Sequence, residues 1–292
     1  MSDAVSLAHS PCPNDTFVFH AWNHGLIPGA PRTEVTIADI DVTNELARRG
    51  ELDVLKVSYA ALPAFLDRYA LLPTGGALGH GCGPLVVVRA DGDGPAPTPS
   101  LLDGAVVAVP SERSTAYLLL RVWAAERLTA GPREIRVLPF QEIMPAVRDG
   151  AVDAGLIIHE ARFTYPRYGL RALVDLGEAW ELRTGLPIPL GAIVARRSLG
   201  AGRLRELADV LRASVTRAWA DPAASARYVR EHAQEMRDEV VKQHIALYVN
   251  EYTADLGPAG YRAVLALLDA AAELGLGPRT DPALLAFPPE GD

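Results

Sequence analysis

The chain has 292 residues and a formal net charge of −8, from 28 Lys and Arg against 36 Asp and Glu. Binding of nucleic acid requires a basic face, so this charge balance excludes nucleic acid as the expected partner. Hydrophobic residues make up 49% and charged residues 22% of the chain, which is ordinary for a folded protein. The length predicts one large or two medium-sized domains.

Cysteine usage and the N-terminus indicate a reducing compartment. Cys12 and Cys82 are too few for a disulfide framework and do not form a CxxC pair. Met1–Ser10 lacks the cationic start and the apolar run of an export signal. Tyr69–Val88 has no charged residue, but its five glycines and two prolines disfavour a lipid-exposed helix. We therefore expect a cytoplasmic protein without a membrane partner.

Short apolar runs alternate with amphipathic helical stretches up to about residue 196, which is the pattern of parallel α/β sheets. From Leu204 to about Glu273 apolar residues recur at helical spacing, which predicts three or four helices. The predicted strands, in chain order, are Val5–Ala8, Val35–Ala38, Val54–Val57, Leu85–Arg89, Ala105–Val109, Ile135–Leu138, Ala154–Ile158 and Ala192–Ala195.

An internal repeat links the two halves of this pattern. Gly50-Glu51-Leu52-Asp53 and Gly150-Ala151-Val152-Asp153 each follow a predicted helix and precede a buried strand. The glycine in each copy suits the C-terminus of the helix before it. The repeat indicates two copies of one βαβ architecture.

A second pair of similar segments predicts the division into lobes. Gly83–Arg89 and Leu190–Arg196 are apolar strands with a glycine near the entry and an arginine at the exit. If each strand carries the chain between lobes, lobe 1 comprises residues 1–88 and 197–292, and lobe 2 is the insert 89–196. The expected fold class is therefore α/β, with two lobes around a central cleft as in periplasmic-type binding proteins.

Candidate ligand contacts follow from the rule that open α/β sheets bind ligands beyond the carboxyl ends of their strands. Asn14 lies within Ser10–Phe17, after two prolines and at the expected start of a helix. Ser114 and Thr115 open a second predicted helix. In both places the side chains either cap the helix or help its N-terminus to bind an anion, and the two roles are compatible. We expect a small anionic molecule as the partner.

Lys56 and His159 are the candidates with the strongest chemistry. Lys56 lies in an otherwise apolar strand, where an ammonium group must pair with an acid such as Asp53 or face a cleft. There it either neutralises that acid or holds a substrate carboxylate, and a Schiff base is a further alternative. His159 ends the apolar run Gly155–Ile158, and the repeat aligns it with the strand end at Ser58 and Tyr59. Its imidazole serves either as a structural group or as a general base.

Other motifs point away from nucleotides and metals. Gly75–Pro84 lacks the Gly-Lys-Ser/Thr ending of a phosphate loop and precedes a strand, so it is interpreted as a hinge loop that approaches the ligand closely. The seven histidines form no HExxH motif and no histidine–carboxylate cluster at ligand spacing. His20 and His24, four residues apart, could hold zinc, but a packed or solvated helix face is the favoured interpretation. No metal is expected.

Five segments, taken together and in order, closely resemble the 1,4-dihydroxy-6-naphthoate synthase family of the futalosine route to menaquinone. The resemblance extends through essentially the whole chain and includes Val249-Asn250. The segments are Ser10–Phe17, Lys56–Ala61, Gly75–Pro84, Ser114–Tyr117 and Ile157–Tyr165.

The resemblance implies a two-lobed fold like that of type II periplasmic binding proteins, used inside the cell as a carbon–carbon lyase without a cofactor. The implied reaction converts cyclic dehypoxanthinyl futalosine to 1,4-dihydroxy-6-naphthoate and a three-carbon fragment, expected to be dihydroxyacetone. A homodimer is a further implication of the resemblance.

The resemblance also implies roles for individual residues. His159 matches the proposed base of the family. The substrate contacts match the strand end formed by Lys56, Val57 and Ser58, and the turn at Ser114 and Thr115. Many relatives carry Thr-Thr where this chain has Ser114-Thr115, and serine keeps the hydroxyl group at the first position. Our hypothesis is that neutral His159 removes a proton from the sugar-derived part of the substrate, and that retro-aldol-type cleavage follows as the ring system becomes aromatic.

Two alternatives compete with this interpretation. Chorismate dehydratase is a relative of the same fold and pathway that acts on a smaller carboxylated substrate. A non-catalytic solute-binding protein would suit the two-lobe pattern, but not the missing export signal. Conversion of chorismate, or ligand binding without conversion, would distinguish these alternatives from the synthase.

Overall fold

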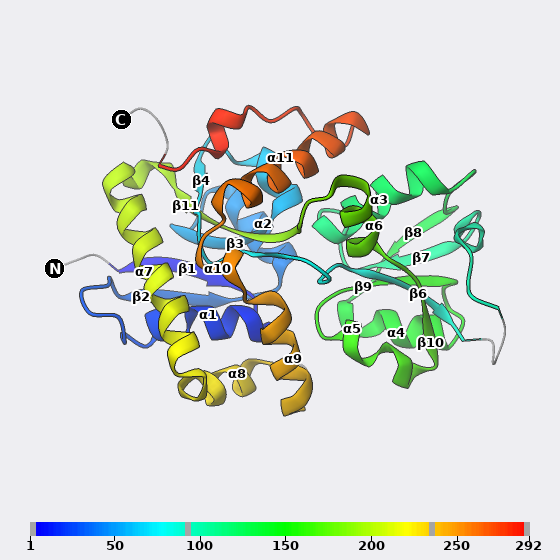
Figure 1. Cartoon of the computed structure of the whole chain (residues 1–292), viewed down its shortest axis with the longest axis horizontal. Coiled ribbons are helices and arrows are strands. Elements are labelled where there is room, and N and C mark those ends of the chain that lie inside the picture. The colour runs from blue at the N-terminus through cyan, green and yellow to red at the C-terminus, as the bar shows by residue number, and fades with distance from the viewer. Residues whose placement is uncertain (1–3, 91–94, 234–236, 289–292) are drawn as a thin grey trace. The chain divides into compact units, whose positions relative to one another are not determined.

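The computed structural model describes residues 4–90, 95–233 and 237–288 (Figure 1). The chain divides into two compact units. Unit 1 comprises Met1–Gly79 and Pro189–Asp292, and unit 2 is the continuous insert His80–Ile188. The chain therefore passes from one unit to the other twice.

Unit 1 is built on a six-stranded sheet with the order β2-β1-β3-β11-β4, and β5 pairs with β11. β1 lies parallel to β2 and β3, whereas β11 is antiparallel to β3 and β4. The strands are β1 (Val5–His9), β2 (Thr33–Ile37), β3 (Val54–Ser58), β4 (Tyr69–Leu71), β5 (Ala77–Gly79) and β11 (Ile188–Arg196).

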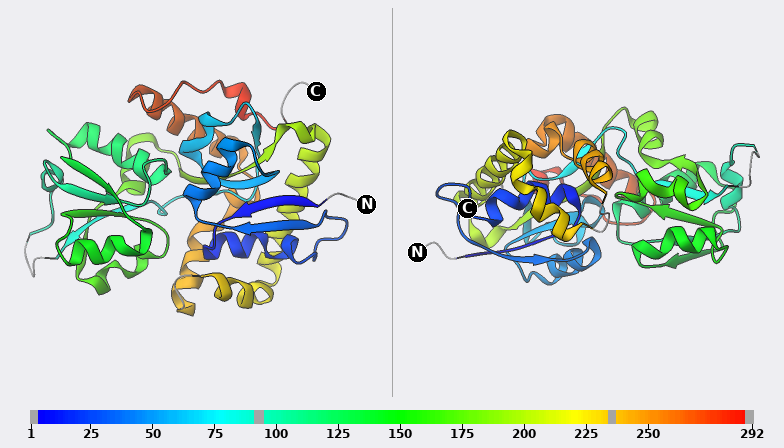
Figure 2. Two further views of the ribbon diagram at one scale, coloured as in Figure 1. Left: turned by 180° about the vertical axis from the view of Figure 1, so that it is seen from behind. Right: turned by 90° about the horizontal axis from the view of Figure 1, so that it is seen from below.

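The helices of unit 1 cover both faces of this sheet, with α1 on one side and α2 on the other (Figure 2). Nearly every residue of α1 is buried, because α7, α8 and α9 pack around it. The helices are α1 (Pro13–Asn23), α2 (Ile40–Arg49), α7 (Ala201–Ala220), α8 (Ala226–His232), α9 (Asp238–Tyr248), α10 (Glu251–Ala254) and α11 (Gly257–Glu273).

Unit 2 has a five-stranded sheet with the order β10-β6-β9-β7-β8, lying between α3 and α6 on one face and α4 and α5 on the other (Figure 1). β7 is parallel to β8 and β9, and β6 is antiparallel to β9 and β10. Its strands are β6 (Leu85–Arg89), β7 (Val106–Val109), β8 (Glu134–Val137), β9 (Ala154–Ile157) and β10 (Leu170–Asp175). Its helices are α3 (Thr115–Arg127), α4 (Phe140–Arg148), α5 (Ala161–Thr164) and α6 (Leu176–Thr184).

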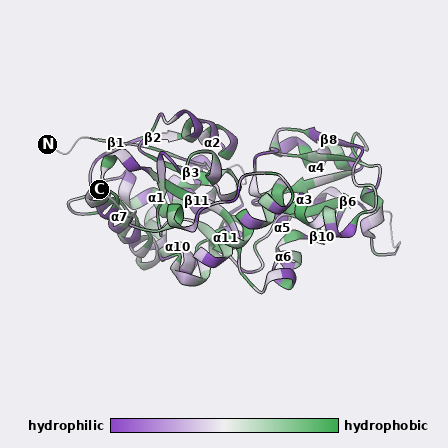
Figure 3. Cartoon of the chain, turned by 90° about the horizontal axis from the view of Figure 1, so that it is seen from above, coloured by the Kyte–Doolittle hydropathy of each residue, from purple (hydrophilic) through white to green (hydrophobic). Residues whose placement is uncertain are grey.

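All eight strands predicted from the sequence are present, with ends displaced by a few residues. Hydrophobic residues are concentrated along interior strands such as β6, whereas β2 and β8 also carry charged residues (Figure 3). The parallel pairing expected from the alternation is present among β1, β2 and β3 and among β7, β8 and β9, but β6, β10 and β11 run antiparallel to their neighbours. Periodicity reports burial but not strand direction. β4, β5 and β10 were missed, and the described C-terminal region has five helices, since α8 and α10 are too short to show a period.

The boundaries between the units differ from the predicted ones. The sequence pattern places the boundaries between residues 88 and 89 and between residues 196 and 197. In the structure, the chain changes unit between residues 79 and 80 and again between residues 188 and 189. β6 pairs with β9 and β10, so it belongs to the inserted unit. β11 pairs with β3 and β4, so it belongs to unit 1. Each of these strands therefore follows the change of unit.

The sequence repeat corresponds to a repeated structural device. Gly50 and Gly150 follow α2 and α4 with left-handed φ values of 71° and 76°. The Asp53 carboxylate accepts hydrogen bonds from the Ser6 main-chain N–H at 3.0 Å and from the Ser6 hydroxyl at 2.7 Å. The Asp153 carboxylate likewise accepts one from the Val106 N–H at 2.8 Å. Each aspartate thus fastens the start of one strand to the start of its parallel neighbour, at the edge opposite the carboxyl ends.

Within the described ranges, no helix is both long enough and apolar enough to cross a bilayer.

Replacing Asp53 with alanine tests this fastening in unit 1. We expect Asp53→Ala to lower the free energy of unfolding by about 1–3 kcal/mol, because two donors on Ser6 lose their acceptor. Urea unfolding followed by circular dichroism measures the change. Asp67→Ala, at an exposed carboxylate beside Arg68, is the matched control and should leave the midpoint unchanged. Equal midpoints for both variants would contradict the assigned role.

Candidate active site

Three of the predicted site residues meet at one edge of the unit 2 sheet. β7 and β9 are adjacent parallel strands, with Val107 opposite Ala154, so both end at the same edge. Ser114 and Thr115 follow β7, and His159 follows β9. The structure therefore brings the segments that carry these hydroxyl groups and the imidazole to the same edge of one sheet.

Ser114 is the N-cap of α3. Its hydroxyl oxygen accepts a hydrogen bond from the Tyr117 N–H at 3.1 Å and donates to the Ser111 carbonyl at 2.9 Å. Thr115 is buried and begins the helix. The capping role predicted for this turn is thus confirmed for Ser114. It leaves the first turn of a 13-residue helix directed at the same edge, where N–H groups and the helix dipole favour an anion.

His159 has an unusual backbone. Among the described residues other than glycine, it alone has a positive φ, at 51°. The half-buried imidazole lies edge-on to the Phe140 ring, with ring centroids 5.6 Å apart. A left-handed conformation is unfavourable for a residue with a side chain, so the surroundings must hold it. Such strain at the end of a buried strand is frequent at functional sites, and no sequence pattern signalled it.

Arg162 supplies part of that support. Its main-chain N–H donates to the His159 carbonyl at 3.3 Å. Its guanidinium group donates to the Gly83 carbonyl at 2.7 Å and to the Asp175 carboxylate at 2.5 Å. Asp175 in turn caps α6 through the Gly177 N–H. The turn that carries His159 is therefore tied to two neighbouring segments, by residues that the sequence analysis missed.

Gly83 shows what one glycine of the predicted hinge loop does. A Cβ atom at this position would lie 2.2 Å from the Gly177 nitrogen. The absence of a side chain is therefore required for packing against the start of α6. The close approach at Gly83 is thus to the backbone of Gly177, whereas the sequence analysis expected this loop to approach a ligand.

In unit 1, Lys56 is paired with an acid that the sequence analysis did not name as its partner. The Lys56 Nζ lies 2.8 Å from an Asp15 carboxylate oxygen, and the two side chains are only 4% and 3% exposed. The expected alternative, Asp53, bonds to Ser6 instead. A Cβ atom on Gly191 would lie 2.6 Å from Lys56 Cε, so this glycine makes room for the lysine stem. Lys56 is thus half of a buried ion pair.

The Asp15 carboxylate is held in its charged form by its neighbours. The Ser10 hydroxyl donates to it at 2.6 Å and the Asn14 amide at 2.8 Å. Burial by itself would raise the pKa of Asp15, but the charge and hydrogen bond of Lys56, with the bond from Ser10, outweigh it and lower that pKa. The lowered pKa favours the carboxylate form of Asp15 in the folded protein.

Asn14, expected as a substrate contact, uses both ends of its amide inside unit 1. Its nitrogen donates to Asp15, and its oxygen accepts from Nε2 of His244 at 2.9 Å. His244 lies on α9 and is buried. Asn14 therefore joins the start of α1 to α9 through a chain that continues to Lys56, and less of its hydrogen-bonding capacity remains for a ligand.

Val57 and Ser58 complete the predicted strand end. The Val57 side chain is fully buried. Asn44 on α2 contacts Ser58 twice: its oxygen accepts from the Ser58 N–H at 2.8 Å, and its nitrogen donates to the Ser58 hydroxyl at 3.1 Å. Within the described part of the chain, the hydroxyl hydrogen of Ser58 has no acceptor, so it can serve a ligand.

His20 and His24 adopt the helix-face arrangement. Their rings lie 4.4 Å apart, and both pack against Tyr228. The His24 Nδ1 donates to the His20 carbonyl at 2.8 Å. Burial, followed by the charges of His24 and Arg217, lowers the pKa of His20. Across the described ranges, no group of three or more His, Cys, Asp or Glu is arranged to hold a metal ion.

The model of a protein family described as menaquinone biosynthesis matches residues 5–273. The chain belongs to this menaquinone biosynthesis family. One relative, from Streptomyces coelicolor, is 65% identical over 98% of this chain and 99% of its own length, and is named 1,4-dihydroxy-6-naphtoate synthase. A relative with the same name from Thermus thermophilus is 48% identical over 94% of this chain and 96% of its own. The resemblance inferred from the sequence is thereby confirmed.

Solved structures relate this family member to a known fold. A protein from Archaeoglobus fulgidus has a TM-score of 0.85 and 33% identity, covering 94% of this chain and 99% of its own. A Candida albicans protein, described as having the generic periplasmic binding protein fold, has a TM-score of 0.73 and 12% identity, covering 97% and 94%. The aliphatic sulphonate binding protein of Escherichia coli gives 0.69 and 13%, covering 100% and 95%. The predicted fold class is confirmed.

Removing one member of the Lys56–Asp15 pair should be far more damaging than removing an exposed charge. We expect Asp15→Asn to lower the free energy of unfolding by about 3–5 kcal/mol, because it leaves a buried ammonium group uncompensated. The loss in the double variant Asp15→Asn/Lys56→Met should be clearly smaller than the sum of the two single losses. Urea unfolding of all three variants provides the cycle.

The control for this cycle is Glu206→Gln, which breaks the exposed pair between Arg203 and Glu206. It should leave the midpoint of unfolding almost unchanged. Additive effects of Asp15→Asn and Lys56→Met would show that the two side chains are not coupled.

Proposed function

We propose that this family member is a carbon–carbon lyase that converts cyclic dehypoxanthinyl futalosine to 1,4-dihydroxy-6-naphthoate, with release of dihydroxyacetone. The observation that carries the proposal is its 65% identity, over nearly the full length of both chains, to the Streptomyces coelicolor protein named 1,4-dihydroxy-6-naphtoate synthase. The arrangement of Ser114, Thr115 and His159 at one sheet edge supports it.

In unit 2, the amino end of α3 is the proposed contact for the anionic part of the substrate. The first turn of a helix has N–H groups without partners inside the helix, and the dipole adds positive potential. Ser114 fixes this turn through its bond with Tyr117, and Thr115 adds a second hydroxyl. A carboxylate or a developing oxyanion is the chemical group that such an arrangement stabilises best.

In unit 1, Ser58 is the proposed hydrogen-bond donor, because Asn44 orients its hydroxyl and leaves the hydrogen available. Val57 can contribute only main-chain atoms, since its side chain is buried. Lys56 contributes positive potential that Asp15 partly neutralises. An ammonium group in such a pair has no lone pair with which to attack a carbonyl, which argues against a Schiff base.

His159 is the proposed general base. A neutral imidazole takes a proton from a hydroxyl group on the sugar-derived part of the substrate, and the resulting oxyanion forms a carbonyl as the adjacent carbon–carbon bond breaks. The electron pair of that bond passes into the ring system, which becomes aromatic after proton transfer, so that the two products together account for all atoms of the substrate. The overall reaction needs no external oxidant in this scheme. The tethered turn around His159 suits this role because a base must be held at a fixed position.

Product analysis tests the proposed reaction directly. The purified protein should convert cyclic dehypoxanthinyl futalosine to 1,4-dihydroxy-6-naphthoate and dihydroxyacetone in equal amounts, as measured by liquid chromatography and mass spectrometry. Chorismate in a parallel incubation should remain unchanged. Dehydration of chorismate, or binding of the futalosine derivative without any conversion, would contradict the proposal.

Substitution of His159 tests the base. We expect His159→Ala to lower turnover roughly 10²- to 10⁴-fold, the usual contribution of general-base catalysis, while substrate binding is retained. Single-turnover rates and isothermal titration calorimetry separate the two effects. Added imidazole should restore part of the rate, because the ring is half-buried and a free base can replace it. Near-normal turnover without imidazole would remove His159 from this role.

A further inference from the structure

Arg162 lies on α5, three residues after His159, and its guanidinium group bonds to two other segments of unit 2. We propose that Arg162 is a positioning residue, which holds the turn of His159 so that the imidazole stays where a general base must act. The proposal rests on the base role proposed above for His159. In it, Arg162 acts through the position of His159 and makes no contact with the substrate.

The turn of His159 has little support from its own local structure. β9 ends at Ile157, and α5, which follows the turn, is only four residues long. A helix of a single turn is not stable by itself. Glu160, the N-cap of α5, makes no side-chain cap hydrogen bond, and His159 has a left-handed φ of 51°. Contacts with other segments must therefore support this backbone.

The register of the unit 2 sheet places two such segments beside the turn. Leu85 of β6 lies opposite Ile157 of β9 and also opposite Asp175 of β10. These three residues form one row across three neighbouring strands, at the edge where β9 ends. The start of β6 and the end of β10 therefore meet at the edge from which the turn of His159 begins.

The guanidinium group of Arg162 connects the turn to both of these strands. It donates to the Gly83 carbonyl, just before β6, at 2.7 Å and to the Asp175 carboxylate, at the end of β10, at 2.5 Å. The side chains of Arg162 and Asp175 are each only 18% exposed, so water and salt screen their attraction less than at the surface. A planar fork with donors in fixed directions suits such a double contact, which the flexible point charge of a lysine would not reproduce.

The two anchors are themselves fixed. The carboxylate oxygen of Asp175 that does not face the guanidinium accepts from the Gly177 N–H at 2.9 Å. The Leu176 N–H donates to the Pro84 carbonyl at 2.9 Å, which joins the start of α6 to the segment before β6. Both acceptors of the guanidinium group are thus tied to each other as well as to the turn of His159.

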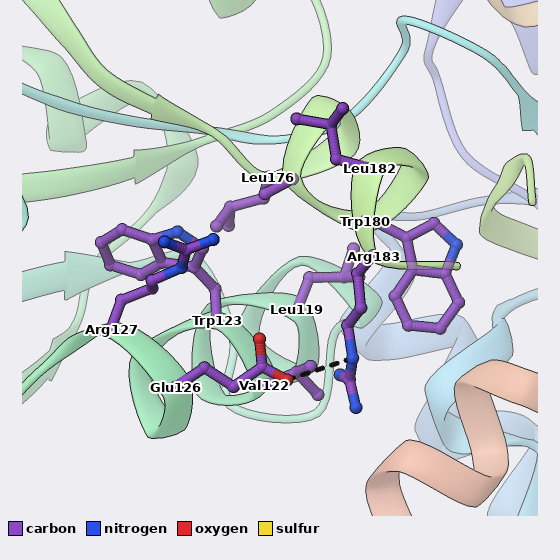
Figure 4. A pocket seen from close by; sticks show the side chains of 10 residues that line it. Leu119, Val122, Trp123, Glu126, Arg127, Leu176, Trp180, Leu182 and Arg183 are labelled. Carbon is purple, nitrogen blue, oxygen red and sulfur yellow. Dashed lines mark ion pairs between the residues drawn. The ribbon is translucent and has the colours of Figure 1, made fainter. Parts of the chain in front are cut away.

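Helix α6 adds a link to the turn proposed to bind the anion. Leu176 and Trp180 on α6 are buried, and α6 packs against α3. Glu126 on α3 pairs with Arg183 on α6, with the carboxylate oxygen and Nε 3.1 Å apart (Figure 4). Arg162 therefore fixes the imidazole relative to a packed pair of helices, and α3 begins at the proposed substrate contact.

Arg162→Gln tests the proposal, because glutamine is shorter and uncharged. With cyclic dehypoxanthinyl futalosine as substrate, kcat should fall roughly 10- to 100-fold, since a misplaced base loses about this much rate. KM should stay within about two-fold, because the substrate contacts are kept. Arg162→Lys keeps the charge without the planar fork and should restore part of the rate. Arg167→Gln, at an exposed arginine of the same segment, is the matched control and should leave kcat and KM unchanged.

Asp175→Asn is a second variant that acts on the same contact. It keeps an oxygen that can accept from Gly177 but removes the charge that pairs with Arg162, so kcat should fall in the same direction. Urea unfolding shows that each variant is folded at the assay temperature. Variants that are less stable but keep the kcat of the parent protein would overturn the proposal, because Arg162 would then serve folding alone.

The double variant His159→Ala/Arg162→Gln separates action through His159 from any other action. Once the imidazole is absent, the loss of Arg162 should cost no further rate, because the two effects are coupled. If Arg162→Gln lowered the rate by the same factor with and without His159, Arg162 would act elsewhere and the proposal would be refuted.

The imidazole can also be observed without turnover. In proton–carbon NMR spectra of histidine-labelled protein, the His159 ring signal is the one absent from His159→Ala. It should shift in Arg162→Gln, whereas the His24 signal, assigned in the same way, should not. An unmoved His159 signal would contradict the positioning role. A shifted signal in a protein that leaves the futalosine derivative unconverted would contradict the proposed reaction instead, and would still support the role of Arg162 in placing the imidazole.

Discussion

Parallel pairing of two strands that a βαβ segment separates in the chain is the constraint on which both candidate site edges depend. In unit 1, β1 lies beside β3, and in unit 2, β7 lies beside β9. Because parallel neighbours end at the same edge, the segments that follow them are brought together although they are far apart in the sequence. Asp53 and Asp153 hold the opposite ends of these strand pairs in register. The repeated aspartate is therefore a structural residue at the edge opposite the proposed site.

The two edges built in this way differ in character. The unit 1 edge contains a buried ion pair, in which Asp15 is bonded to Lys56, Ser10 and Asn14. A pair this deeply buried is not explained by stability alone, since well-packed apolar residues often serve equally well there. The Lys56–Asp15 pair also fixes the positions of two opposite charges at this edge. The unit 2 edge instead presents a half-buried imidazole on a strained turn, which suits a group that exchanges a proton.

Helix α3 connects the proposed active site with α6. Its first turn carries Ser114 and Thr115, and its later turns carry Trp123 and Arg127. The helix is held at both ends of this span, by the Ser114 cap and by packing against α6. α6 itself is capped by Asp175, which bonds to Arg162 next to the turn of His159. The turn proposed to bind the anion and the turn of His159 are therefore linked through α6, Asp175 and Arg162.

The sequence by itself determined the α/β class, eight strands, the internal repeat, the family, and the placement of Ser114, Thr115 and His159 after their strands, because burial and helix starts leave local patterns. Tertiary structure decided the antiparallel course of β6 and β11 and with it the boundaries between the units. It also gave Lys56 its partner Asp15 and Asn14 its partner His244, and it set the positive φ of His159. These features depend on contacts between segments that are far apart in the sequence and on the backbone strain that those contacts support. Such contacts produce no periodic pattern in the sequence.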